Sequence, residues 1–347
     1  ALPHWRADVP GYHAVLGMHA FGLEETGDYL HAEREGRRAV ELQPRDTWAW
    51  HAVAHVCEMR NAPADGIAWL EPNSAHWATD SFFAVHNWWH LALFMLEQDR
   101  HDDVLALYDR AIGGPASGVV LDLIDQSALL WRLLLRGVDV GDRWQPLADR
   151  WAPAADGGNY AFNDLHAMMA FVGAGRADGE ARVLAAQRAA MAGDGDNRAF
   201  TAEVGHAAAL ALQAFGRGDY ASAVRLLRPI RSHAHRFGGS HAQRDLLDLT
   251  LVEAALRGGD PVLGGALAAE RVALRPASPF ARRLFARAEH RFDGGGLRSD
   301  PRHHLPGGTA LTGEEHHQAH ARPRARPRAA HRAPGCDQTL RRTPGRE

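Results

Sequence analysis

The sequence of 347 residues contains no lysine, so all 39 of its basic residues are arginines. Its only two cysteines, Cys57 and Cys336, are too few for a disulfide framework or for a zinc site of four thiolates. This scarcity is typical of proteins of the reducing cytoplasm. No run of 18 apolar residues occurs, which predicts that no segment spans a membrane. We therefore expect a cytoplasmic protein.

Motifs for nucleotide binding and for α/β-hydrolase chemistry are also missing, since no Gly-x-Gly-x-x-Gly, Walker or Gly-x-Ser-x-Gly pattern occurs. The formal net charge is −3. Residues 297–347 hold ten arginines against five acids, a net of +5, which leaves −8 for the rest of the chain. A mildly acidic body argues against binding to nucleic acid.

Helical periodicity is present up to about residue 292, with apolar residues at three- and four-residue spacing and short turns such as Gly27-Asp28. Residues 27–44, GDYLHAEREGRRAVELQP, are typical of the second helix of a tetratricopeptide repeat, with the small Ala32 at the close contact between helices. Comparable positions recur along the chain at Gly66, Val104, Ala181, Ala223 and Gly264. The long gap before Ala181 holds an intermediate pair, Val119–Arg136 and Arg143–Trp151.

This pattern predicts an all-α fold, an α-solenoid of about seven degenerate helix pairs of tetratricopeptide type, over residues 1–292. Residues 293–347 are rich in Arg, Pro, His and Gly and hold few periodic apolar side chains. Such a segment buries too little surface to offset the entropy of ordering it. We expect it to be a disordered tail, and we assign it no function.

Histidines are concentrated in residues 46–97, where two His-x-x-x-His pairs occur, His51/His55 and His86/His90. A spacing of four residues places both rings of a pair on one face of a helix. Positions are counted along each repeat, with the small residue of its second helix as position 20. His51 and His55 then occupy positions 5 and 9, on the first helix of their repeat. The same register puts His86 at position 2, His90 at position 6 and His166 at position 5. These positions predict imidazoles that line one concave groove.

Imidazole is a common zinc ligand, so His51, His55, His86 and His90 are candidate ligands for a divalent metal such as zinc. Nearby carboxylates, Glu58, Asp80 and Asp164, are candidates for a general base beside a metal-bound water. A metal-free histidine acid/base site and purely structural histidines remain alternatives. The zincin motif is excluded because its glutamate is missing from HAVAH, and the di-iron Glu-x-x-His pattern is absent.

Six of the ten tryptophans fall in the same stretch. They are expected mostly to fill the core between helices, with one or two facing the groove. A further candidate is Arg244 in GGSHAQRDLL, either as an anion clamp or as part of a capped helix with a local ion pair to Asp245. Ser240 is the expected N-cap of that helix.

Several blocks of unusual composition occur in one order between about residues 5 and 290: DTWAWHAVAHVCEM, HNWWHLALF, LYDRAI, RWQPLADR, FNDLHAMMA, RPIRSHAHRFGGSHAQRD and ERVALRPASP. On these blocks the chain resembles the tetratricopeptide repeat protein 38 family. The resemblance implies a cytosolic α-solenoid with further repeats upstream, so the chain is expected to be truncated at its N-terminus. It implies no particular reaction, and no catalytic residue can be transferred from it.

Two functional hypotheses follow. In the first, which the common use of the fold favours, the solenoid is a scaffold that binds a protein, a peptide or a small molecule in a His-rich groove. The second is a metal-dependent or histidine acid/base enzyme of hydrolase type. It requires that the imidazoles converge in a closed pocket, whereas the scaffold requires only an open groove.

Overall fold

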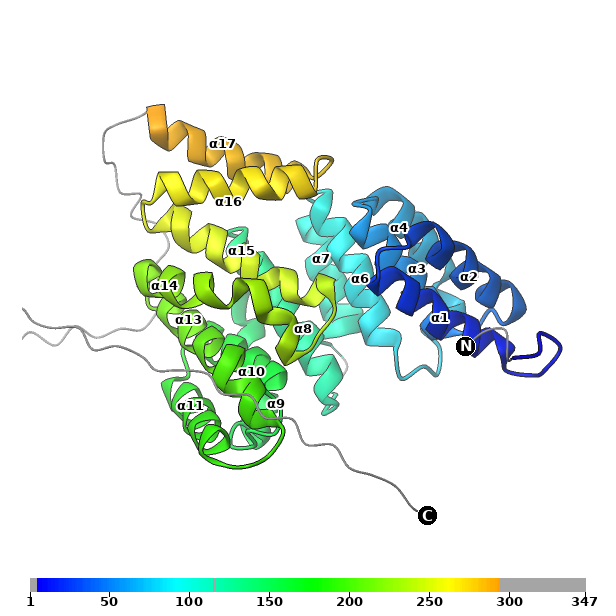
Figure 1. Ribbon diagram of the computed structural model, residues 1–347, viewed down its shortest axis with the longest axis horizontal. Coiled ribbons are helices and arrows are strands. Elements are labelled where there is room, and N and C mark those ends of the chain that lie inside the picture. Colours follow the sequence, from blue (N-terminus) through cyan, green and yellow to red (C-terminus); the bar gives the residue numbers. More distant parts are fainter. Residues whose placement is uncertain (1–4, 115–116, 294–347) are drawn as a thin grey trace, which may run out of the picture. The chain divides into compact units, whose positions relative to one another are not determined.

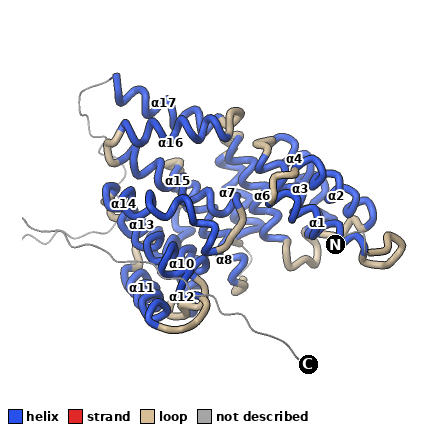
Figure 2. The backbone as a smooth tube through the Cα atoms, viewed as in Figure 1, coloured by secondary structure: helices blue, strands red, loops and turns tan. Residues whose placement is uncertain are grey.

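The computed structural model describes residues 5–114 and 117–293, with side chains as far as residue 290. Within these ranges every regular element is a helix and no strand is present, which confirms the all-α class (Figure 2). The basic tail predicted for residues 293–347 lies outside the described residues except for Asp293, where the last helix ends. In the described part, no helix combines the length and the apolar character that crossing a membrane requires.

The α-helices follow one another with short connections (Figure 1). Their bounds are α1 Tyr12–Glu25, α2 Tyr29–Leu42, α3 Thr47–Met59, α4 Pro63–Leu70, α5 Ser74–Trp77, α6 Ala84–Glu97, α7 His101–Leu107, α8 Val120–Leu135, α9 Trp144–Trp151, α10 Ala161–Gly173, α11 Ala177–Ala192, α12 Asn197–Phe200, α13 His206–Gly216, α14 Tyr220–Ile230, α15 His241–Arg257, α16 Pro261–Leu274 and α17 Pro279–Asp293. Short 3-10 or π segments continue or connect several of them, at Glu71–Asn73, Tyr108–Ile112, Gly141–Arg143, Ala152–Ala154, Thr201–Gly205 and Arg231–Phe237.

Gly-Asp turns start several of these helices, as the sequence indicates. Gly27 adopts a left-handed backbone conformation with φ of 86°. The side chain of Asp28 then accepts the backbone N–H of His31, which caps the first turn of α2. Asp219 and Asp260 cap α14 and α16 in the same way. The turn therefore both ends one helix and satisfies the free N–H groups of the next.

Consecutive helices pack against each other in a regular order. The helices α1/α2, α3/α4, α6/α7, α8/α9, α10/α11, α13/α14 and α15/α16 contact each other as neighbours in sequence. The first helix of each of these pairs also contacts the first helix of the next pair, as α3 contacts α6 and α6 contacts α8. The intermediate pair expected between residues 119 and 151 is present as α8 and α9.

Small residues mark the close contacts within this arrangement. Ala32, Gly66, Val104, Ala223 and Gly264 are each the fourth residue of a second helix, and each is buried. A Cβ atom on Gly66 would lie 2.3 Å from the ring of Phe94, so only glycine allows α4 to approach α6 this closely. The position predicted at Ala181 is wrong, because that residue is exposed and the fourth residue of α11 is the buried Glu180.

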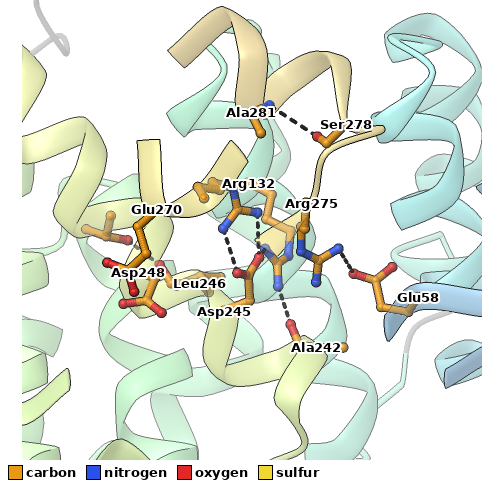
Figure 3. Close-up of polar contacts among 12 residues, drawn as sticks. Glu58, Arg132, Ala242, Asp245, Leu246, Asp248, Glu270, Arg275, Ser278 and Ala281 are labelled. Carbon is orange, nitrogen blue, oxygen red and sulfur yellow. Dashed lines mark hydrogen bonds and ion pairs between the residues drawn. The ribbon is translucent and has the colours of Figure 1, made fainter. Parts of the chain in front are cut away.

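α15 departs from the neighbour-to-neighbour order because it also contacts α3 and α8. A buried network of ion pairs accompanies these contacts (Figure 3). Asp245 of α15 receives two hydrogen bonds from Arg271, at 2.7 and 2.9 Å, and lies 3.6 Å from Arg132 of α8. Arg275 donates to Glu58 of α3 at 3.0 Å. The C-terminal helices are thereby linked by charge to helices more than 100 residues earlier.

Candidate functional site

The two predicted histidine pairs lie on adjacent helices, His51 and His55 on α3 and His86 and His90 on α6. α3 begins at a defined place because Asp46 caps it by accepting the backbone N–H of Ala49 at 3.0 Å. The four-residue spacing then turns both rings of each pair to the α3–α6 interface. All four side chains are buried, and one ligand atom from each lies within 4.8 Å of the others. We refer to His51, His55, His86 and His90 as the four-histidine cluster.

Asp125 fixes the orientation of the His86 ring by contacting its Nδ1 atom. Its Nδ1 atom lies 2.9 Å from both carboxylate oxygens of Asp125 on α8. We assign the proton to Nδ1, because a ring N–H centred on a carboxylate is the favourable arrangement. The Nε2 atom is then free to accept or to bind a cation, and it lies 3.2 Å from Nε2 of His51. In metal-binding histidines, the ring nitrogen that does not bind the metal often donates its N–H to a carboxylate in this way.

Aromatic rings enclose the four-histidine cluster. Phe21 stacks on His51 with ring centroids 5.4 Å apart, and Phe83 meets the same ring edge-on at 4.8 Å. Trp48 lies 4.9 Å from His51, and Trp89 stacks on His86 at 5.3 Å. The indole N–H groups of Trp48 and Trp89 are buried and have no hydrogen-bond partner. The cluster therefore lies in an apolar environment that strengthens electrostatic interactions.

Other tryptophans of the segment have a structural role instead. Trp50 donates its indole N–H to the carbonyl of Pro44 at 2.8 Å, Trp69 donates to the carbonyl of Trp50, and Trp77 donates to the carbonyl of Leu70. These bonds tie the start of α3 to α4 and α5. Most of the six tryptophans therefore belong to the core, as expected.

Burial favours the neutral form of three imidazoles of the cluster, His51, His55 and His90. Desolvation, followed by repulsion from the neighbouring rings, lowers the pKa of His51 and of His90 well below the usual histidine value. The same causes lower the pKa of His55 to about 3. Burial raises the pKa of the Asp125 carboxyl, and the adjacent His86 opposes that shift. Neutral imidazole binds a single metal ion through its unprotonated nitrogen.

Two glutamates at the end of α1 adjoin the cluster. Glu24 is buried, and its Oε2 atom lies 3.6 Å from Nδ1 of His55. Glu24, Glu25 and His55 form a second group whose potential ligand atoms lie within 4.8 Å of one another. Burial, followed by repulsion from Glu25, raises the pKa of Glu24 to about 8. Arg244, whose charge partly offsets that shift, is close to both carboxylates.

The structure does not add His166 to this cluster. His166 lies on α10, and its Nδ1 atom donates to the carbonyl of Phe162 at 2.7 Å. Within the described ranges it belongs to no group of three or more potential metal ligands. Burial lowers the pKa of His166 to about 4 and raises that of the neighbouring Asp164 to about 6. The predicted placement of His166 beside the other rings started from Ala181, whose register is off by one residue.

The other charged candidates have partners of their own. Glu58 pairs with Arg275, and Asp80 is exposed and lies 3.6 Å from Arg45. Ser240 caps α15 as predicted. The local ion pair predicted between Arg244 and Asp245 is wrong, because Arg244 donates to the carbonyl of Gly239 while Asp245 pairs with Arg271. With Glu24 and Glu25 beside it, Arg244 is poorly suited to clamp an anion.

A surface pocket of about 300 Å³ lies next to the cluster. Trp48 and Phe83 line the pocket and also contact His51, so these two rings separate the pocket from the buried imidazoles. The polar lining of the pocket includes Arg45 and Asp80. A small molecule in this pocket would be one aromatic ring away from the cluster.

Sequence reasoning missed Asp125 and Glu24, the two carboxylates that adjoin the imidazoles. A signal for Asp125 exists: with Ala128 as position 8 of its helix, Asp125 falls at position 5, the position assigned to His51. No comparable local signal marks Glu24, which comes one turn after the buried Ala20 at the end of α1.

No protein-family model matches the chain.

Proposed function

We propose that this chain is a helical-repeat protein of tetratricopeptide type that binds a divalent transition-metal ion, zinc in the first instance, on the four-histidine cluster. One observation carries the proposal. Five of the eight ring nitrogens in the cluster are buried without a hydrogen-bond partner: His51 Nδ1, His55 Nδ1 and Nε2, and His90 Nδ1 and Nε2. Buried polar atoms without partners are costly, and a bound cation would satisfy one nitrogen of each ring.

The dimensions of the cluster fit such an ion. Zinc binds imidazole nitrogen at about 2.0–2.1 Å, so two ligands of a tetrahedral site are separated by about 3.4 Å. The His51 and His86 Nε2 atoms are 3.2 Å apart, and all four ligand atoms lie within 4.8 Å of one another. Imidazole ligands suit zinc, copper, nickel and iron rather than magnesium or calcium. When bound, an ion of this kind supplies positive charge and Lewis acidity.

The repeat assignment is supported by the order of helix contacts and by the buried residue at the fourth position of the second helices. Both features are what the resemblance to the tetratricopeptide repeat protein 38 family leads us to expect. A plain binding scaffold with an open groove is less well supported, because α15 contacts α3, whose His51 and His55 are expected to face the groove. For the hydrolase-like alternative, a small-molecule substrate has a pocket nearby, but Trp48 and Phe83 separate that pocket from the imidazoles.

Metal content of the purified full chain tests the proposal. The protein is stripped with a chelator, loaded with zinc and freed of weakly bound metal, and the tightly bound zinc is measured by mass spectrometry. We expect the double variant His51→Ala/His86→Ala to bind at least one equivalent less than the wild type, since two of the four ligands are removed. Circular dichroism checks that the variant is folded.

The matched control is His31→Ala/His235→Ala, which removes two exposed histidines. The six histidines after residue 292 are present in every variant, so zinc held there cancels in the comparison. Equal zinc content in the wild type and in His51→Ala/His86→Ala, repeated with copper and nickel, would show that the cluster is a packed core of neutral histidines.

Asp125→Asn is expected to weaken zinc binding by about 10–100-fold without abolishing it, because the carboxylate that orients His86 is replaced by an amide. The control is Asp122→Asn, three residues earlier on α8, whose carboxylate accepts from Ser117 and does not reach the cluster. Competition against a zinc chelator of known affinity measures both. An unchanged affinity in Asp125→Asn would mean that the hydrogen bond to His86 does not serve the metal.

A further inference from the structure

A second group of potential ligands lies against the four-histidine cluster. Glu24 and Glu25 end α1, His55 comes from α3, and one potential ligand atom from each lies within 4.8 Å of the others. Glu24 is only 1% exposed and His55 is fully buried. The group is therefore mostly internal, and it combines oxygen and nitrogen ligands from two helices that pack directly against each other.

The carboxyl groups at this place have few polar partners. Both carboxylate oxygens of Glu24 and Oε1 of Glu25 are buried without a hydrogen-bond partner. The two residues stand in the last turn of α1, where the free carbonyl groups of a helix already carry partial negative charge. Arg244 is near, but it donates to the carbonyl of Gly239. Ionisation of both carboxyl groups in such surroundings calls for a cation beyond Arg244.

His55 independently points to the same place. Neither of its ring nitrogens has a hydrogen-bond partner, although the side chain is fully buried. Its Nδ1 atom lies 3.6 Å from Oε2 of Glu24, which is too far for a hydrogen bond. An ion between these two atoms would give both of them a partner. The ring has a second nitrogen, Nε2, for the other imidazoles.

We propose that Glu24, Glu25 and His55 bind a second divalent cation, and that His55 is shared as an imidazolate, with Nδ1 facing the carboxylates and Nε2 facing His51, His86 and His90. Binding of the second ion then releases the remaining ring proton of His55 and the proton of Glu24 to solvent. The centre is then dinuclear, with a nitrogen-rich site and a mixed carboxylate and imidazole site. Oxygen and nitrogen ligands together suit zinc or manganese. The inference rests on the proposed function, because the shared ring requires a metal in the four-histidine cluster.

Glu25 gives the second site access to solvent. Its side chain is 28% exposed and lies 3.7 Å from Nε2 of the half-exposed His241. The four-histidine cluster has no side chain exposed to this extent. We therefore expect the second ion to exchange faster than the first and to be removed first by a chelator.

Zinc stoichiometry of the full chain separates the two sites. The wild type is expected to hold two tight equivalents more than a variant that lacks both sites, His55→Ala combined with His51→Ala/His86→Ala. Glu24→Gln/Glu25→Gln is expected to lose one equivalent and to keep the other. Its matched control is Glu41→Gln/Asp65→Asn, which removes two exposed carboxylates.

Copper loading tests the shared ring. Two Cu²⁺ ions joined by one imidazolate couple magnetically, so the paramagnetic resonance signal per copper should be reduced in the wild type. It should return to full intensity in Glu24→Gln/Glu25→Gln, which keeps a single ion. Two bound coppers with full signal would overturn the sharing of His55.

The two proposals fail differently. If Glu24→Gln/Glu25→Gln binds as much zinc as the wild type while His51→Ala/His86→Ala binds less, the second site is wrong and the first stands. If none of these variants differs from the wild type, the proposed metal-binding function itself is wrong.

Discussion

Asp245→Asn is expected to lower the free energy of unfolding by about 3–5 kcal/mol. Asparagine keeps the shape of the side chain but removes its charge, which leaves the buried Arg132 and Arg271 without their counter-ion. Burial opposes ionisation of Asp245, yet the charges of Arg271 and Arg275 outweigh it and hold the pKa of that carboxyl well below its usual range. The prediction is checked by urea unfolding followed by circular dichroism.

The control for this variant is Asp248→Asn, one turn later on α15. Asp248 also pairs with an arginine, Arg231 at 2.6 Å, but its side chain is 40% exposed. Exposed pairs contribute about 0–1 kcal/mol, so this variant should be nearly as stable as the wild type. Equal losses in the two variants would mean that the buried network does not hold α15 against α8 (Figure 3).

Glu24→Gln is expected to stabilise the metal-free protein by about 3 kcal/mol at pH 7. Burial and the neighbouring Glu25 raise the pKa of Glu24 to about 8 in the folded state, against an ordinary value of 4.5. The folded protein therefore holds a proton that the unfolded chain releases, and stability falls as the pH rises above 4.5. Glutamine resembles the protonated acid and avoids this loss.

The pH dependence has a definite sign. The advantage of Glu24→Gln should shrink to about 1 kcal/mol at pH 5, where the unfolded carboxyl is itself partly protonated. Urea unfolding with a chelator present, at pH 7 and pH 5, measures it. The other charged residues that act on the pKa of Glu24 are Arg244, which lowers it, and Glu58, which raises it. Both are unchanged in the variant, so they do not contribute to the difference from the wild type. A loss of stability at pH 7, or the same gain at both pH values, would show that Glu24 is ionised in the folded protein.

With zinc present, the effect of the two glutamates on stability is expected to reverse. The carboxylates that are unfavourable in the metal-free protein become ligands, so Glu24→Gln/Glu25→Gln should gain less stability from added zinc than the wild type. A ligand that binds only the folded state stabilises it in proportion to the logarithm of its concentration over the dissociation constant. The same two residues thus lower the free energy of unfolding of the metal-free protein and give the site its affinity for a cation.

Local sequence pattern is sufficient to predict the helices. The three- and four-residue spacing of apolar side chains predicts the all-α class, and the Gly-Asp turns predict where α2, α14 and α16 begin. The same spacing predicted that the rings of His51 and His55 share one face of α3. These features depend on residues within one or two turns of each other, which is the range that helix periodicity covers.

The register from one helix pair to the next is predicted less reliably. The sequence pattern predicts Ala181 as the small residue of its helix, but α11 begins one residue too early for that, and the placement predicted for His166 is wrong as a result. A helix turns by about 100° per residue, so an error of one residue directs a side chain to a different neighbour. Connections of unequal length, such as the one that includes Thr201–Gly205, make such errors hard to avoid.

The sequence by itself determined that this is a helical protein with two pairs of imidazoles, each pair on one face of a helix. Only the tertiary structure decided that the two pairs meet, that Asp125 and Glu24 adjoin them, and that α15 lies against α3 and α8. Such contacts join residues from about 30 to more than 200 positions apart, as in the pair of Glu58 with Arg275. They depend on how far each helix is shifted and rotated against the next, and that is set by packing of the whole core rather than by any local pattern.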